Sequence, residues 1–188
     1  DIHDSTSDVT GETFISATGG TITTSGNFKI HTFTSGATFC VSSLSNIPAN
    51  NEVSYLVVAG GGGSGGGGGG AGGFRESESG VDSYTASPLE GSSNLTVTAQ
   101  AYPITVGAGG AAKAGSPYPG AGNDGTNSVF STITSAGGGG SGAFETPGNN
   151  GGSGAGGSSG GTKTGGTGNT PPVSPPQGNN GGSTSGSG

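Results

Sequence analysis

The chain has 188 residues, of which 47 are glycine, and only 26% are hydrophobic. This composition excludes a large conventional core, and the lack of a strict Gly-X-Y register excludes collagen. With a net charge of −7 and only 4 Lys and Arg, the chain has no basic face for nucleic acid. Since no apolar run approaches the roughly 20 residues of a membrane-spanning helix, we also expect no membrane insertion.

The first part of the chain predicts short β-strands joined by turns. Residues 1–18 are polar and rich in turns, and we expect a connecting segment with a short strand over 13–17. Residues 21–24 and 27–34 alternate on either side of Ser25-Gly26 and predict a β-hairpin. Because the chain has no Met and no signal-like start, we expect a processed product or part of a longer protein.

The next strand is expected over 37–43. Alternation puts Cys40 on the face opposite to Phe39 and Val41. As the sole cysteine, it is interpreted as a buried and unreactive thiol. His31, in the preceding hairpin, is expected to pack within its strand rather than to bind a metal.

The strongest strand signal is residues 52–59, which are apolar on both faces from Tyr55 onward and predict a central, covered strand. Residues 74–91 are polar and irregular. Later strands are expected over 94–100, 102–106 and 129–134. No stretch has helical periodicity, so we expect an all-β fold with essentially no α-helix.

Glycine-rich runs follow the strands repeatedly, at 60–73, 107–110, 137–142 and 148–168. Polyglycine forms an extended threefold helix whose N–H and C=O groups point sideways, so neighbouring runs can bond to one another. A recurring strand-then-glycine pattern therefore predicts a small β-sandwich-like domain with packed polyglycine II excursions over 60–168. Residues 60–73 should then be ordered and hydrogen-bonded to the other runs.

Three regions are expected along the chain. Residues 1–18 form the connecting segment, residues 19–161 the glycine-rich β domain, and residues 162–188 a Gly/Pro/Ser-rich tail or linker.

Several motifs occur in a fixed order along the chain: Gly19-Gly20-Thr21, His31-Thr32-Phe33-Thr34, Phe39-Cys40-Val41, Tyr55-Leu56-Val57-Val58-Ala59, Gly70-Ala71-Gly72-Gly73-Phe74-Arg75-Glu76, Tyr102-Pro103-Ile104-Thr105-Val106-Gly107-Ala108-Gly109-Gly110 and Ser128-Val129-Phe130-Ser131-Thr132-Ile133-Thr134. In this order they resemble the glycine-rich domain of bacteriophage tail-fibre and virion proteins, especially those of marine phages and cyanophages. The glycine runs also resemble, in architecture only, the polyglycine sandwiches of tail-fibre tip adhesins in T-even-type phages.

The resemblance implies a non-enzymatic part of the virion surface that attaches to a host receptor, either a glycan or an outer-membrane component. Other virion proteins are expected partners, and a homotrimer is compatible with a fibre. The alternative is a structural virion protein, capsid-decorating or filament-forming, whose glycine-rich surfaces self-associate. An ice-binding protein and a surface hydrolase rank lower.

No motif in the sequence predicts catalysis, a cofactor or a metal site. Gly-x-Gly-x-x-Gly matches are trivial in glycine runs, and no amphipathic helix follows them. His3 and His31 are too few for zinc. The carboxylates Glu76, Glu78, Asp82 and Glu90 lie in a polar insert and are interpreted as a solvated loop rather than a glycosidase pair.

Aromatic residues in polar loops are the tentative receptor-binding residues, because an aromatic plane can stack on a sugar ring. They are Phe74, Tyr84, Tyr118 and Phe144, with Arg75 beside the first. The competing interpretation is that each ring closes the end of the β-core or of the glycine bundle.

Overall fold

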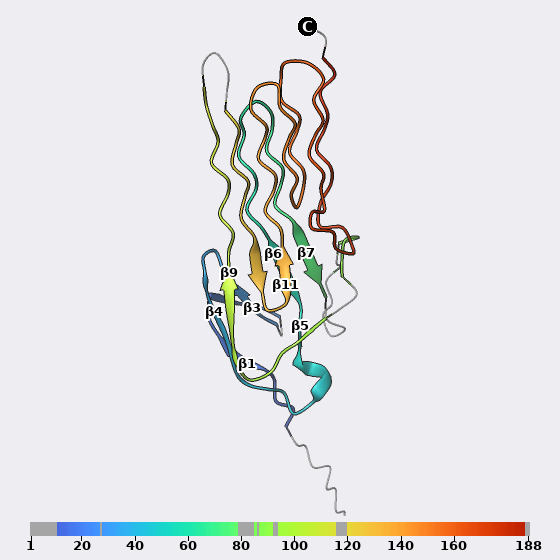
Figure 1. Ribbon diagram of the computed structural model, residues 1–188. Coiled ribbons are helices and arrows are strands. Elements are labelled where there is room, and N and C mark those ends of the chain that lie inside the picture. The colour runs from blue at the N-terminus through green and yellow to red at the C-terminus, as the bar shows by residue number, and fades with distance from the viewer. Residues whose placement is uncertain are drawn as a thin grey trace, which may run out of the picture.

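The protein consists of short β-strands at one end and a bundle of extended glycine-rich segments at the other (Figure 1). The computed structural model describes residues 11–26, 28–78, 85, 87–91, 94–115 and 120–186. In these ranges the one helix is η1 (Pro48–Asn51), a short 3-10 helix, and no helix is long and apolar enough to cross a membrane. The expected all-β fold class is confirmed.

The strands are short and pair in antiparallel fashion. In chain order they are β1 (Ser16–Thr18), β2 (Thr21–Ser25), β3 (Phe28–Thr32), β4 (Ala37–Ser43), β5 (Glu52–Val53), β6 (Tyr55–Val58), β7 (Phe74–Ser77), β8 (Leu95–Thr96), β9 (Ala101–Thr105), β10 (Ser128–Phe130) and β11 (Ile133–Ser135). The main sheet has the order β1-β4-β9-β10-β11, and two-stranded sheets join β2 to β3, β5 to β8 and β6 to β7.

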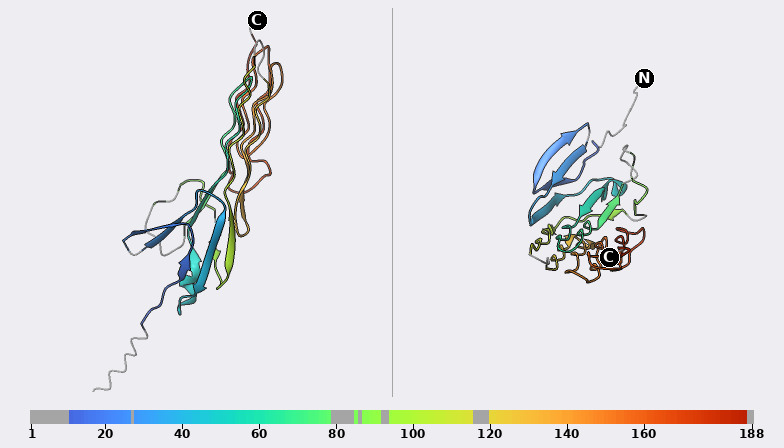
Figure 2. Two further views of the ribbon diagram at one scale, coloured as in Figure 1. Left: turned by 90° about the vertical axis from the view of Figure 1, so that its left-hand side faces the viewer. Right: turned by 90° about the horizontal axis from the view of Figure 1, so that it is seen from above.

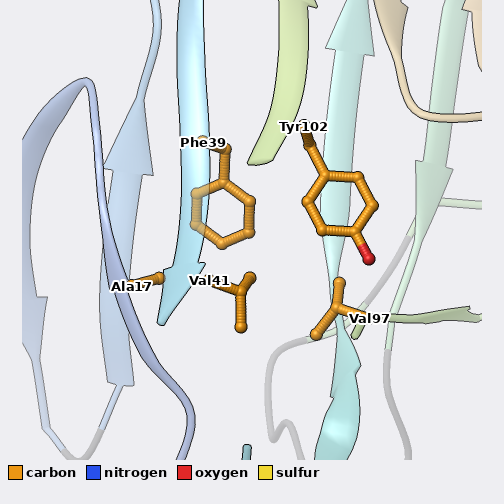
Figure 3. Packing of buried hydrophobic residues seen from close by; sticks show 5 residues of the cluster. All are labelled: Ala17, Phe39, Val41, Val97 and Tyr102. Carbon is orange, nitrogen blue, oxygen red and sulfur yellow. The ribbon is translucent and has the colours of Figure 1, made fainter. Parts of the chain in front are cut away.

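The hydrophobic core is small and aromatic. Its buried members are Ala17, Phe39, Val41, Val97 and Tyr102 (Figure 3). The Phe39 ring meets Phe130 edge-on at a centroid distance of 5.8 Å, a favoured geometry for aromatic pairs. Burial acts to raise the pKa of Tyr102, but hydrogen bonds from Thr98 and Gln100 to its hydroxyl lower that pKa overall.

Alternation along the sequence predicted the first strands well. The hairpin is present as β2 and β3, with Ser25 opposite Phe28 at its end. Strand β4 has the expected bounds. Phe39 and Val41 are buried and Cys40 is half-buried, so the cysteine does lie on the other face, although it is less buried than expected.

The prediction of a covered central strand over 52–59 is wrong in two respects. It is split into β5 and β6, and Leu56 and Val58 are 61% and 51% exposed. An apolar pattern on both faces of a strand therefore does not show that the chain itself buries both faces.

Other strand predictions differ in their bounds. The strand expected over 129–134 is broken at Ser131, whose φ of 53° makes a tight turn between β10 and β11. Of residues 94–100, only Leu95–Thr96 is a strand, although Val97 is buried. Strand β7 lies in a stretch expected to be irregular, and it pairs with β6.

The glycine-rich runs form an ordered bundle in which hydrogen bonds repeat every third residue. Gly60 N–H donates to Thr126 O at 3.1 Å, and Gly63, three residues later, donates to Asn123 O at 2.8 Å. The same step recurs where Gly138 donates to Gly60 O and Ser141 to Gly63 O. A three-residue repeat is that of the polyglycine II helix. The prediction that residues 60–73 are ordered and bonded to the other runs is confirmed.

Segment 136–142 lies at the centre of the bundle, and its residues are buried. Its backbone exchanges hydrogen bonds with segments 59–66, 67–73, 120–127, 146–152 and 153–159. Side chains of segment 120–127 satisfy two further N–H groups, because Gly137 N–H donates to Asn127 Oδ1 at 2.9 Å and Gly140 N–H to Asp124 Oδ1 at 2.6 Å. Side-chain oxygens thus supply acceptors in addition to the backbone carbonyls.

Close approach between segments requires glycine at these positions. A Cβ built on Gly62 would lie 2.0 Å from Gly139 O, and one on Gly60 would lie 2.0 Å from Ala108 O. Those are backbone atoms, so no side-chain rotation could relieve the overlap.

Residues 163–184, expected to belong to a tail, take part in the bundle. Gly181 N–H donates to Gly166 O at 2.8 Å, and Thr184 N–H donates to Lys163 O at 2.9 Å. Gln177, only 2% exposed, anchors this part at the base, where its Oε1 accepts the Ala136 N–H at 2.7 Å. Backbone pairing with the preceding runs, which composition does not reveal, distinguishes this segment from a linker.

Candidate attachment surfaces

The first candidate surface is the bundle tip, defined as residues 64–68, 113–115, 143–146 and 159–162. Segments that leave β6, β9 and β11 run away from the sheets and reach the end of the bundle farthest from them (Figure 1). Turns from several parts of the sequence therefore meet there, as surface loops on a scaffold commonly do in binding proteins.

Hydrogen bonds hold the described tip turns in place. Glu145 N–H donates to Ser159 O at 3.1 Å, and Thr146 N–H donates to Ser158 Oγ at 2.9 Å. The Phe144 ring is half-buried beside Gly160, where a Cβ would lie 2.7 Å from the ring. Lys113 and Glu145 are exposed. The described part of the tip thus presents a partly exposed ring and carries charges of both signs.

The predicted receptor-binding residues do not form one patch. Phe74 and Arg75 begin β7 at the base of the bundle, where Phe74 N–H donates to Gln177 O at 2.9 Å. Phe144 lies at the opposite end, and at about 3.1 Å per residue the segment 136–142 alone spans about 20 Å. Tyr84 and Tyr118 lie outside the described residues.

The second candidate surface is an open groove of about 1440 Å³ at the sheet end, between the β2-β3 hairpin and strands β6, β9 and β10. Large apolar side chains line it although they are exposed: Phe14 67%, Leu56 61%, Val58 51%, Ile30 46% and Phe28 39%. The sequence interpretation missed this surface. The apolar outer face of residues 52–59 indicates this surface, but the prediction assigned that face to the interior of the chain.

Two of the carboxylates considered for catalysis, those of Glu76 and Glu90, accept hydrogen bonds from described backbone. Glu76 Oε2 accepts the Ser87 N–H and Glu90 Oε1 accepts the Glu78 N–H, both at 3.0 Å. Asp82 lies outside the described residues. Where side chains are described, no group of His, Cys, Asp and Glu is arranged to hold a metal ion. This geometry gives Glu76 and Glu90 a structural part.

His31 packs within its hairpin, as expected. Its Nδ1 lies 2.8 Å from Gly19 O, and its ring meets that of Phe39 edge-on at 5.0 Å. The imidazole is thereby oriented by the core and by a backbone carbonyl.

Comparison with known proteins gives one family match. The family described as "Glycine-rich domain" matches residues 34–188, which include most of the strands and the whole bundle. No curated protein and no solved structure matches the chain. The match covers well over half of the sequence, and the chain therefore belongs to the glycine-rich domain family.

Proposed function

We propose that this protein is a non-enzymatic component of a bacteriophage virion surface, a tail fibre or fibre-like part, that attaches to a host-cell receptor. In this proposal the bundle tip meets the receptor, and the sheet end faces the rest of the virion. The receptor is a surface glycan or an outer-membrane component.

One observation carries the proposal: turns distant in sequence are gathered at one end of a bundle that is hydrogen-bonded throughout. Segment 136–142 is tied to its neighbours every third residue, so the bundle can hold the turn that carries Phe144 in a fixed place. A preorganised surface loses less entropy on binding than a flexible one. Phe144 offers an apolar plane, and Lys113 and Glu145 offer charges for polar groups of a glycan.

The rival proposal, self-association through glycine-rich surfaces, has less support. Two N–H groups at the side of the bundle are already capped by side chains: Asn180 Oδ1 accepts the Gly168 N–H at 2.8 Å, and Asn150 Oδ1 accepts the Thr167 N–H at 2.7 Å. These capped donors cannot also bond to a neighbouring glycine helix.

Adsorption to cells tests the proposal. The fluorescently labelled full chain is mixed with a panel of bacteria that differ in surface glycans, and retention is measured by flow cytometry. On a strain that retains the chain, Lys113→Glu and Phe144→Ser should each lower retention about tenfold, whereas Leu44→Ser, an exposed change at the sheet end, should not.

Two results would contradict this function. One is that no strain retains the folded chain. The other is that a strain retains the chain and that both tip variants are retained as well as the unmodified protein, because the tip would then not be the attachment surface.

A further inference from the structure

The β2-β3 hairpin projects from the sheet end as an arm. Figure 2 shows it set apart from the bundle in both views. Among the described residues it forms a sheet of two strands with no third strand at either edge, and its described residues are exposed except for His31, which is half-buried. Because an isolated pair of strands is marginally stable in water, a protruding arm of this kind gains most by packing against something else.

The arm and the groove present apolar surfaces to each other across open space. Phe28 and Ile30 of the arm and Leu56 and Val58 of β6 line the same groove. The exposed fractions of Phe14 and Phe28 add up to about one whole phenylalanine side chain, which is roughly 150–250 Å². With the aliphatic side chains added, the patch reaches the size that marks interaction sites on soluble proteins.

Exposed apolar side chains are concentrated outside the bundle. Within the described ranges, the large exposed hydrophobic residues all lie outside the glycine segments: Phe14, Ile22, Phe28, Ile30, Leu44, Ile47, Leu56, Val58 and Leu89. Five of these nine residues line the groove, so the groove is not a general feature of a glycine-rich surface.

Charges of both signs line the groove of each chain. The arm carries Lys29, and Glu12 and Glu52 also line the groove. Lys29 makes no ion pair with any described residue. In a twofold pair of copies, the arm of each would bring Lys29 to the carboxylates of the other, since a twofold interface repeats every contact.

We propose that a second copy of this chain covers the groove, with the arms exchanged between the two copies. Each copy then inserts its apolar arm into the groove of the other, and both grooves are filled at once. This inference concerns the sheet end and does not depend on receptor binding at the bundle tip.

Sedimentation equilibrium of the full chain at micromolar concentrations tests the proposal. The unmodified protein should be a dimer. Leu56→Asp and Phe14→Ser, at side chains that are already mostly exposed, should each raise the dissociation constant at least about thirtyfold. Ile47→Asp is the matched control, because Ile47 is 41% exposed and does not line the groove.

A charge reversal tests the role of Lys29. Lys29→Glu should weaken association about tenfold in low salt and less in high salt, whereas Lys113→Glu, the same charge change at the bundle tip, should leave it unchanged. Circular dichroism of each variant confirms that it is folded.

A monomeric unmodified protein would overturn the proposal, because the groove would then be open or reserved for another partner. An oligomer that persists in folded Leu56→Asp and Phe14→Ser would also overturn it, since the contact would lie elsewhere.

Discussion

The sheet end and the glycine bundle of this protein are stabilised in different ways. At the sheet end, Phe39, Tyr102 and Val41 exclude water by packing side chains. In the bundle, large side chains are scarce and backbone groups satisfy one another at a spacing that only glycine permits. The comparison teaches that a chain with half the usual apolar content can still order most of its length, provided that many segments share hydrogen bonds.

Removal of a core ring should have the largest effect on stability. Phe39 is 7% exposed and meets the rings of His31, Phe33, Tyr102 and Phe130. Phe39→Ala should lower the free energy of unfolding by about 3–5 kcal/mol, as measured by urea denaturation. A loss below about 1 kcal/mol would mean that this cluster does not hold the sheets together.

A single added methyl group should destabilise the bundle, because its segments pack through backbone atoms. Gly62→Ala places Cβ 2.0 Å from Gly139 O, and forced separation of the segments should cost about 1–3 kcal/mol or more. Gly68→Ala is the matched control, because nothing lies within 4 Å of its Cβ. Equal stability of the two variants in thermal denaturation would refute close packing of the segments.

Loss of a side-chain cap should have the smallest effect of the three. Asp124 Oδ1 accepts the Gly140 N–H at 2.6 Å and an Asn149 side-chain N–H at 2.9 Å. Asp124→Ala leaves the buried Gly140 N–H without this acceptor and should cost about 1–3 kcal/mol. Asp124→Asn retains an acceptor oxygen, so its loss should be clearly smaller in the same denaturation assay.

Local patterns predicted the strands better than they predicted what covers them. Alternation placed residues 37–43 and the hairpin before them correctly, because a strand with one buried face leaves a period of two. The exposure of Leu56 and Val58 was not predictable in this way. A face covered by a partner has the same sequence pattern as a face covered by the chain itself.

The ordered structure of the bundle was predictable for glycine runs that directly follow a strand, and less predictable for the other segments. Residues 60–73 follow the strongest strand, which made an ordered run the better interpretation. Residues 163–184 follow no strand, and their composition is that of a linker. Their ordered structure depends on the hydrogen-bond register with distant segments, as between Gly181 and Gly166. Amino-acid composition does not reveal this register. The predicted receptor-binding residues show the same difficulty, because the sequence alone did not indicate that Phe74 and Phe144 lie at opposite ends of the bundle.

Amide hydrogen exchange of the glycine-labelled protein, followed by NMR, tests the bundle most directly. The Gly138 amide, which donates to Gly60 O at 2.9 Å in the buried centre, should exchange roughly a thousandfold or more slowly than an unfolded chain. The exposed Gly68 amide should exchange almost freely. Exchange of Gly138 at the unfolded rate in the folded protein would contradict an ordered, mutually hydrogen-bonded glycine bundle.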